Sequence, residues 1–127
     1  PAEDDKWMNL IRIFGGHLLD GMDREEVSTW FFEVWNEPNL RFFFDGTQED
    51  YFHLYEMTAR TLRMWTLFRV GGPATSVNAW IPEFRSFCEE HQVPLDFITT
   101  HHYPSDDPLS TMGMNGPGVK GHLPWIR

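Results

Sequence analysis

The fold is decided by residues 30–40, which read WFFEVWNEPNL. Residues 29–35 are rich in aromatic and β-branched side chains, which favour a strand. Residues 36–39, NEPN, are polar and turn-forming, and we expect a loop over residues 36–46. The sequence therefore predicts a buried strand whose end carries several polar side chains.

The segments on either side of this strand have the spacing of helices. Before the strand, apolar residues recur with helical spacing at Trp7, Leu10, Ile11, Phe14 and Leu18. After it, Thr47 and Asp50 have the spacing of a capping box, which predicts the start of a helix that continues to Trp65. Glycines at 15, 16 and 21 weaken the end of the first helix.

Two further strands and one more helix follow. Residues 67–70 form a short apolar run that we expect to stop at the glycines and proline of residues 71–73. Ser76 or Asn78 can cap a third helix, and residues 95–102 have strand composition. The order α-β-α-β-α-β with short connections predicts an α/β fold, in which a parallel sheet carries helices on its faces.

Composition and charge limit the ligands of this chain. The 127 residues are 41% hydrophobic and 16% aromatic, so residues 1–104 are expected to form a packed unit. Residues 105–127 are rich in glycine and proline, and we expect a loop or disordered tail there. The formal charge of −9 argues against nucleic acid and anionic membrane surfaces as partners, whereas an uncharged ligand is compatible with it.

Several other classes of site lack the residues they need. The single cysteine, Cys88, excludes an internal disulfide and lies in an apolar helical stripe, so we expect it in the core. The six histidines have no metal-ligand spacing, and neither a metal nor another cofactor is expected. We find no transmembrane run and no signal-peptide pattern, and the chain begins at Pro1, which suggests an excised segment.

The polar end of the first strand has two interpretations. Asn36 and Glu37 stand where parallel α/β folds place functional side chains, at the carboxyl end of a strand. Taken alone, the run Asn-Glu-Pro-Asn is equally compatible with a simple polar turn. The other strands decide between these interpretations.

Three ordered motifs resemble those of one enzyme family. Residues 30–40 resemble the acid/base strand of clan A glycoside hydrolases, specifically family 39, which contains β-xylosidases and α-L-iduronidases. Residues 70–75, VGGPAT, and 96–104, DFITTHHYP, are similar to that family's fifth and sixth strands. Residues 39–40 are closer to the xylosidase branch. The resemblance covers about residues 7–105, and departs at residues 21–23 and again after Pro108.

The resemblance implies a fold and a reaction. The fold would be a partial (β/α)8 TIM barrel, from about helix 3 through strand 6, because a complete barrel needs at least about 200 residues. The reaction would be retaining, β-xylosidase-like hydrolysis of a carbohydrate substrate. In the family the nucleophile is a glutamate on the seventh strand, which this chain does not reach, so we expect the chain alone to be inactive. The alternatives are a non-catalytic sugar-binding or vestigial fragment, and α-L-iduronidase-type specificity.

The resemblance also implies roles for four residues. Glu37 would be the general acid/base, which protonates the glycosidic oxygen and then activates water. Asn36 would hydrogen-bond the sugar 2-hydroxyl, His101 would lie near the sugar, and Tyr103 would hold the nucleophile. The alternative for Asn36 is a turn residue, and for the other two it is a strand end satisfied by backbone partners.

Two further groups of residues are candidates for the site. Strand alternation would put Glu33, Trp35 and Glu37 on one face, with Glu33 about 13 Å from Glu37 and thus too deep to be the second carboxylate. We expect Glu33 to form an ion pair inside the barrel instead. The aromatic run at residues 42–44 either stacks on a sugar ring or packs as a staple between loop and helix.

Overall fold

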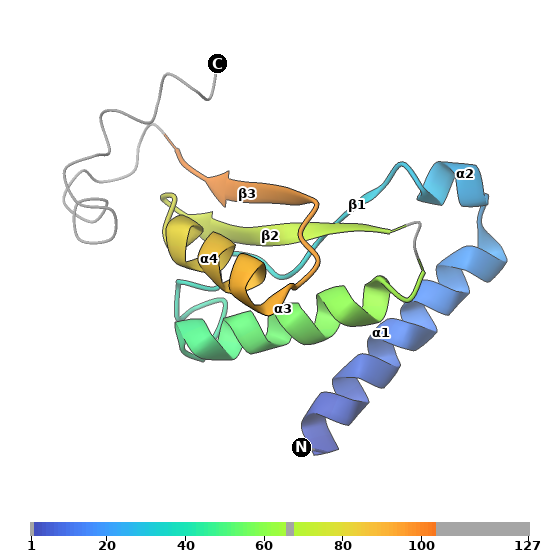
Figure 1. Ribbon diagram of the computed structural model, residues 1–127, viewed down its shortest axis with the longest axis horizontal. Coiled ribbons are helices and arrows are strands. Elements are labelled where there is room, and N and C mark those ends of the chain that lie inside the picture. Colours follow the sequence, from blue (N-terminus) through green and yellow to red (C-terminus); the bar gives the residue numbers. More distant parts are fainter. Residues whose placement is uncertain (1, 66–67, 104–127) are drawn as a thin grey trace.

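The computed structural model describes residues 2–65 and 68–103, which form three parallel strands and four helices. The elements are α1 (Ala2–Gly21), α2 (Arg24–Val27), β1 (Phe31–Glu33), α3 (Gln48–Leu62), β2 (Arg69–Ser76), α4 (Ile81–His91) and β3 (Phe97–His101). The sheet order is β1-β2-β3, so successive strands are neighbours (Figure 1). The predicted α/β class with a parallel sheet is confirmed. The tail predicted at residues 105–127 lies outside the described residues.

The core lies between the sheet and helices α3 and α4. Tyr51 and Tyr55 of α3, Phe84 of α4 and Val70 of β2 are all fully buried in one cluster. On the opposite face of the sheet, Phe31 is 61% exposed and its neighbours Glu33 and Arg69 are exposed as well. Among the described residues, the helices therefore cover one face of the sheet and leave the other exposed.

Strand β2 is longer than predicted, because the turn signal at residues 71–73 lies inside the strand. β2 is the central strand, and pairing on both sides holds its backbone extended where the local sequence favours a break. Gly71 is needed for close approach: a Cβ there would collide with the carbonyl oxygen and ring of Phe97. The register to β3 shifts between Pro73 and Thr75.

A tyrosine supplies a donor that the ladder lacks at the end of β1. The Val34 N–H donates to the Gly71 carbonyl at 3.0 Å, so the Val34 carbonyl would next accept from the N–H of residue 73. Residue 73 is proline and has no N–H. The Tyr51 hydroxyl donates to the Val34 carbonyl instead, at 2.8 Å. Burial raises the pKa of Tyr51 well above its usual range, which keeps this hydroxyl protonated.

The helix starts were predicted with mixed success. The capping box at α3 is confirmed, since Thr47 Oγ1 accepts from the Asp50 N–H and the Asp50 carboxylate accepts from the Thr47 N–H. The predicted caps of α4, Ser76 and Asn78, are wrong. The N-cap is Trp80, in the left-handed region at φ 64° and without a side-chain cap, because Ser76 belongs to β2. The short helix α2 has no counterpart in the predicted elements.

Asp96, in the segment before β3, binds both the end of α3 and the amino end of β2. Asp96 accepts from the Val70 N–H at 2.8 Å and from Arg63 Nη2 at 2.5 Å. Burial disfavours the charged carboxylate, but the bonds from Arg63 and Val70 outweigh it and lower the pKa of Asp96. This contact lies at the end of the sheet opposite the polar residues that follow β1.

Candidate active site at the carboxyl end of the sheet

The chain leaves β1 in a conformation that the sequence pattern did not predict. Trp35 and Glu37 both lie in the left-handed region, with φ 72° and 46°. That region costs an L-residue about 1–2 kcal/mol, so tertiary contacts must hold the turn. Trp35 Nε1 donates to the Phe43 carbonyl at 2.8 Å. The prediction that Glu33, Trp35 and Glu37 share one strand face is wrong, because regular alternation ends with β1 at Glu33.

After the turn, the chain reattaches to β2 at two points. The Glu37 N–H donates to the Ala74 carbonyl at 2.9 Å. Asn39 then pairs with the backbone of Ser76 in both directions: the Ser76 N–H donates to Asn39 Oδ1 at 2.9 Å, and Asn39 Nδ2 donates to the Ser76 carbonyl at 3.3 Å. These bonds extend the contact between the first and second strands beyond the regular ladder.

Glu37 and His101 meet across the end of β2. His101 Nδ1 lies 3.2 Å from Glu37 Oε1, and the Glu37 side chain is only 14% exposed. His101 is the last residue of β3 and the register partner of Ser76. Its carbonyl accepts from the Val77 N–H at 2.7 Å. Two residues that are 64 positions apart in sequence thus form one polar pair at the carboxyl edge of the sheet.

This pair has the composition of an acid–base site. With the carboxylate ionised, His101 Nδ1–H donates to Glu37; with the carboxylic acid, the hydroxyl can donate to an unprotonated Nδ1. A carboxyl group held in this way is positioned to give and to take a proton, which is the requirement for general acid–base chemistry.

The other two predicted site residues lie nearby in the chain. Asn36 directly precedes Glu37 and is exposed. Tyr103 follows the end of β3 and is 59% exposed. The structure thus joins Glu37 to His101 by direct contact, and places Asn36 and Tyr103 at the same edge by chain position.

Of the aromatic run at residues 42–44, one ring packs between the loop and the helix and two are exposed. The ring of Phe44 packs between Trp35 and Tyr51, with centroid distances of 5.8 and 6.1 Å, and it forms the staple between loop and helix. Phe42 is 99% exposed and Phe43 is half-exposed, so these two rings face solvent beside the loop.

Sequence reasoning missed several polar residues at this edge. The sequence pattern indicates for Asn39 only a similarity to the xylosidase branch, and for Ser76 only a possible helix cap. Asn78 Nδ2 and Oδ1 and Thr99 Oγ1 are buried and have no hydrogen-bond partner. Buried polar atoms are rarely left unpaired, so these groups mark an incompletely satisfied region next to the strand ends. No local pattern in the sequence signals it.

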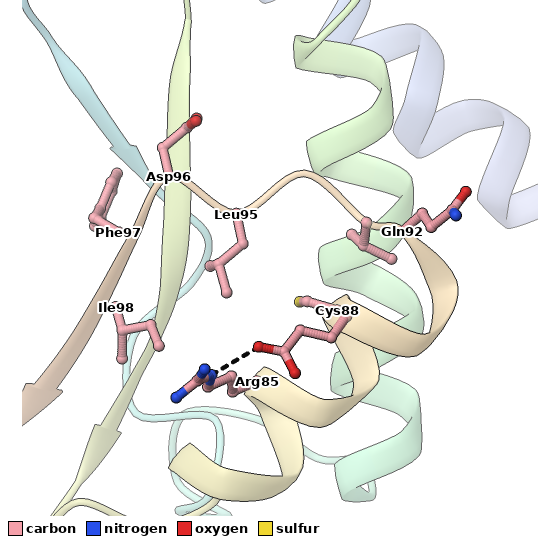
Figure 2. A pocket seen from close by; sticks show the side chains of 9 residues that line it. Arg85, Cys88, Gln92, Leu95, Asp96, Phe97 and Ile98 are labelled. Carbon is pink, nitrogen blue, oxygen red and sulfur yellow. Dashed lines mark hydrogen bonds and ion pairs between the residues drawn. The ribbon is translucent and has the colours of Figure 1, made fainter.

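Two cavities in the described part of the chain lie away from this pair. The larger, about 450 Å³, is a groove between α4 and β3, with Cys88, Leu95 and Ile98 in its wall and the ion pair from Arg85 to Glu89 at its side (Figure 2). The smaller, about 190 Å³, is an apolar space between α1, α3 and β1. Neither is lined by Glu37 or His101.

Neither metal ligation nor membrane insertion is indicated in residues 2–65 and 68–103. Within these ranges no three histidine, cysteine or acidic side chains are grouped to hold a metal ion. The helices described there are too short or too polar to span a bilayer.

Comparison with known proteins identifies close relatives. The sequence model of glycosyl hydrolases family 39 matches residues 1–115. A beta-xylosidase from Caldicellulosiruptor saccharolyticus is 49% identical over 87% of this chain and 23% of its own length. A beta-xylosidase from Geobacillus stearothermophilus is 44% identical over 85% of this chain and 22% of its own length. The chain thus spans less than a quarter of these curated relatives.

A solved structure confirms the arrangement of the elements. The GH39 beta-xylosidase from Caulobacter crescentus matches 87% of this chain and 25% of its own, with 43% identity and a TM-score of 0.78. The three parallel strands and their helices therefore correspond to part of a known family 39 structure.

Proposed function

The chain belongs to glycosyl hydrolase family 39, and from this premise we propose that it supplies the acid/base half of a retaining β-xylosidase-like active site. The contact between Glu37 and His101, 3.2 Å apart at the carboxyl edge of the sheet, carries this proposal. Family membership alone implies a glycosidase, and two relatives of 44–49% identity are beta-xylosidases. In the proposed arrangement β1, β2 and β3 are strands four to six of a (β/α)8 barrel.

Glu37 acts in both steps of the proposed reaction. As a carboxylic acid it protonates the glycosidic oxygen while the sugar transfers to the nucleophile. As a carboxylate it then takes a proton from the water that releases the sugar. His101 contacts the same carboxylate and orients it. Asn36 bonds the sugar 2-hydroxyl, and Tyr103 holds the nucleophile.

The nucleophile lies outside the described residues in this proposal. Glu33 pairs with Gly71, whereas the Glu37 N–H bonds to Ala74, three residues further along β2. Three residues of strand correspond to about 10 Å, whereas the carboxyl groups of a retaining pair are about 5–5.5 Å apart. Glu33 is therefore assigned to the interior of the proposed barrel, and a glutamate of another strand completes the site.

The test compares leaving groups in the product of the full reading frame that contains this sequence. Glu37→Gln should lower kcat/KM for phenyl β-xyloside by about 100-fold or more, because the poor leaving group needs the acid. For 2,4-dinitrophenyl β-xyloside, glycosylation should change far less. Glu49→Gln, an exposed carboxylate in the first turn of α3, is the matched control. Equal rates for the Glu37 variant and the control would remove Glu37 from the mechanism.

The isolated 127-residue chain offers a second test. We expect no hydrolysis of aryl β-xylosides by it, since the proposed nucleophile is not among its residues. Turnover that is abolished by Glu37→Gln would contradict this assignment.

A further inference from the structure

We propose that Asn39 is a positioning residue that, through the backbone of Ser76, sets the contact between Glu37 and His101. This inference deepens the proposed function, on which it rests only for the role of Glu37 as the acid/base. It concerns a residue outside the proposed catalytic and sugar-binding set. Its test measures the contact itself rather than catalysis.

The first step of the argument is the row of bonds across the three strand ends. Asn39 holds both backbone groups of Ser76, at 2.9 and 3.3 Å. Ser76 is in turn the register partner of His101 on β3. The next residue, Val77, donates its N–H to the His101 carbonyl at 2.7 Å. A single backbone position of β2 therefore locates the loop on one side and the histidine on the other.

The second step is the need for an external restraint on the loop. Glu37 lies in the left-handed region, which a glutamate does not favour, and Trp35 just before it does as well. The regular pairing of β1 ends at Glu33, so it does not hold these residues. The Glu37 N–H bond to Ala74 holds one side of the turn, and Asn39 holds the other.

The third step is that the side-chain chemistry of Asn39 matches its partner. The side-chain amide presents a carbonyl oxygen that accepts and an NH2 group that donates in one plane, the same two kinds of group that a strand backbone presents. The Asn39 side chain thus takes the place of one residue of a neighbouring strand in bonding Ser76, and the loop backbone itself need not be extended. Alanine would lose both bonds, whereas aspartate would keep the acceptor for the Ser76 N–H and lose the donor to its carbonyl.

The experiment uses the 127-residue chain and ¹⁵N NMR of the His101 ring. In the parent chain, Glu37→Gln should change the ¹⁵N chemical shifts of the His101 ring, because the two side chains are in contact. In an Asn39→Ala background, the chemical-shift change that Glu37→Gln causes at His101 should be smaller by at least about twofold. Asn39→Asp should give an intermediate response. Asn9→Ala, an exposed asparagine on α1, should leave the response unchanged.

Two indole signals separate positioning from general unfolding. Trp7 Nε1 donates to Thr58 Oγ1 at 2.8 Å, a bond between α1 and α3, and its signal reports the packing of these two helices. Trp35 Nε1 reports the start of the loop. If both indoles keep their shifts while the His101 response falls, Asn39 positions the pair. An undiminished His101 response in Asn39→Ala, or in Asn39→Asp should the alanine variant unfold, overturns the proposal.

Discussion

Replacing Tyr51 by phenylalanine tests how the end of β1 is held. The substitution keeps the ring and removes the hydroxyl that donates to the Val34 carbonyl at 2.8 Å. Pro73 has no N–H to take its place, and Tyr51 is completely buried. The hydroxyl also packs closely against β2, because a Cβ built on Gly72 would lie only 2.8 Å from its oxygen.

The magnitude follows from the group left behind. An ordinary hydrogen bond contributes about 0.5–1.5 kcal/mol net, whereas leaving a buried acceptor unpaired costs about 1–3 kcal/mol. We therefore expect Tyr51→Phe to lower the free energy of unfolding by about 2 kcal/mol. With a urea m-value near 2 kcal/mol/M, the midpoint should fall by about 1 M.

Urea denaturation followed by tryptophan fluorescence measures this change, and Tyr55→Phe is the matched control. The Tyr55 hydroxyl donates to the Pro94 carbonyl, also at 2.8 Å, but does not contact β1. Hydrogen exchange should quicken at the Val34 and Glu37 amides only in Tyr51→Phe. A loss below about 0.5 kcal/mol, or equal exchange in both variants, would refute the reasoning that Tyr51 replaces the missing donor of Pro73.

Three further predictions concern other parts of the fold. Gly71→Ala should lower the free energy of unfolding by about 1–3 kcal/mol because its Cβ collides with Phe97, whereas Gly16→Ala, which meets open space, should not destabilise; thermal melts of both variants check this. The lowered pKa of Asp96 means that its stabilisation is present above about pH 4 and is lost as the pH falls, so Asp96→Asn should flatten the decline in stability between about pH 5 and 3; an unchanged slope would contradict it. Burial raises the pKa of Cys88 to about 12, so at pH 8 about one thiol in 10,000 is ionised, and a disulfide reagent should label it only after unfolding; rapid labelling of the folded chain would show that the thiol is accessible.

Much of the fold could be predicted because local signals agree with the tertiary structure. The capping box at Thr47 needs only residues that are three apart, and it forms as predicted. The alternation of helical and strand spacing was sufficient for the parallel sheet, since short connections leave few other arrangements. The errors arose where non-local pairing overrides local preference. Residues 71–73 look like a turn, but two neighbouring strands hold them in β2.

The candidate site divides in the same way. The sequence by itself determined the residue types: a strand that ends in Asn36 and Glu37, and a second strand that ends in His101. It also determined the family, because those types occur in an order that family 39 shares. These are properties of contiguous residues, which a sequence displays directly.

Only the tertiary structure decided how these residues meet. The 3.2 Å contact between Glu37 and His101 depends on a turn with two left-handed residues, and neither of them is the glycine that would signal such a turn. The turn exists because Tyr51, Asn39 and the backbone of β2 supply hydrogen bonds from distant positions. Backbone strain compensated by non-local bonds has no local signature, and for that reason the strand alternation predicted through Glu37 was wrong.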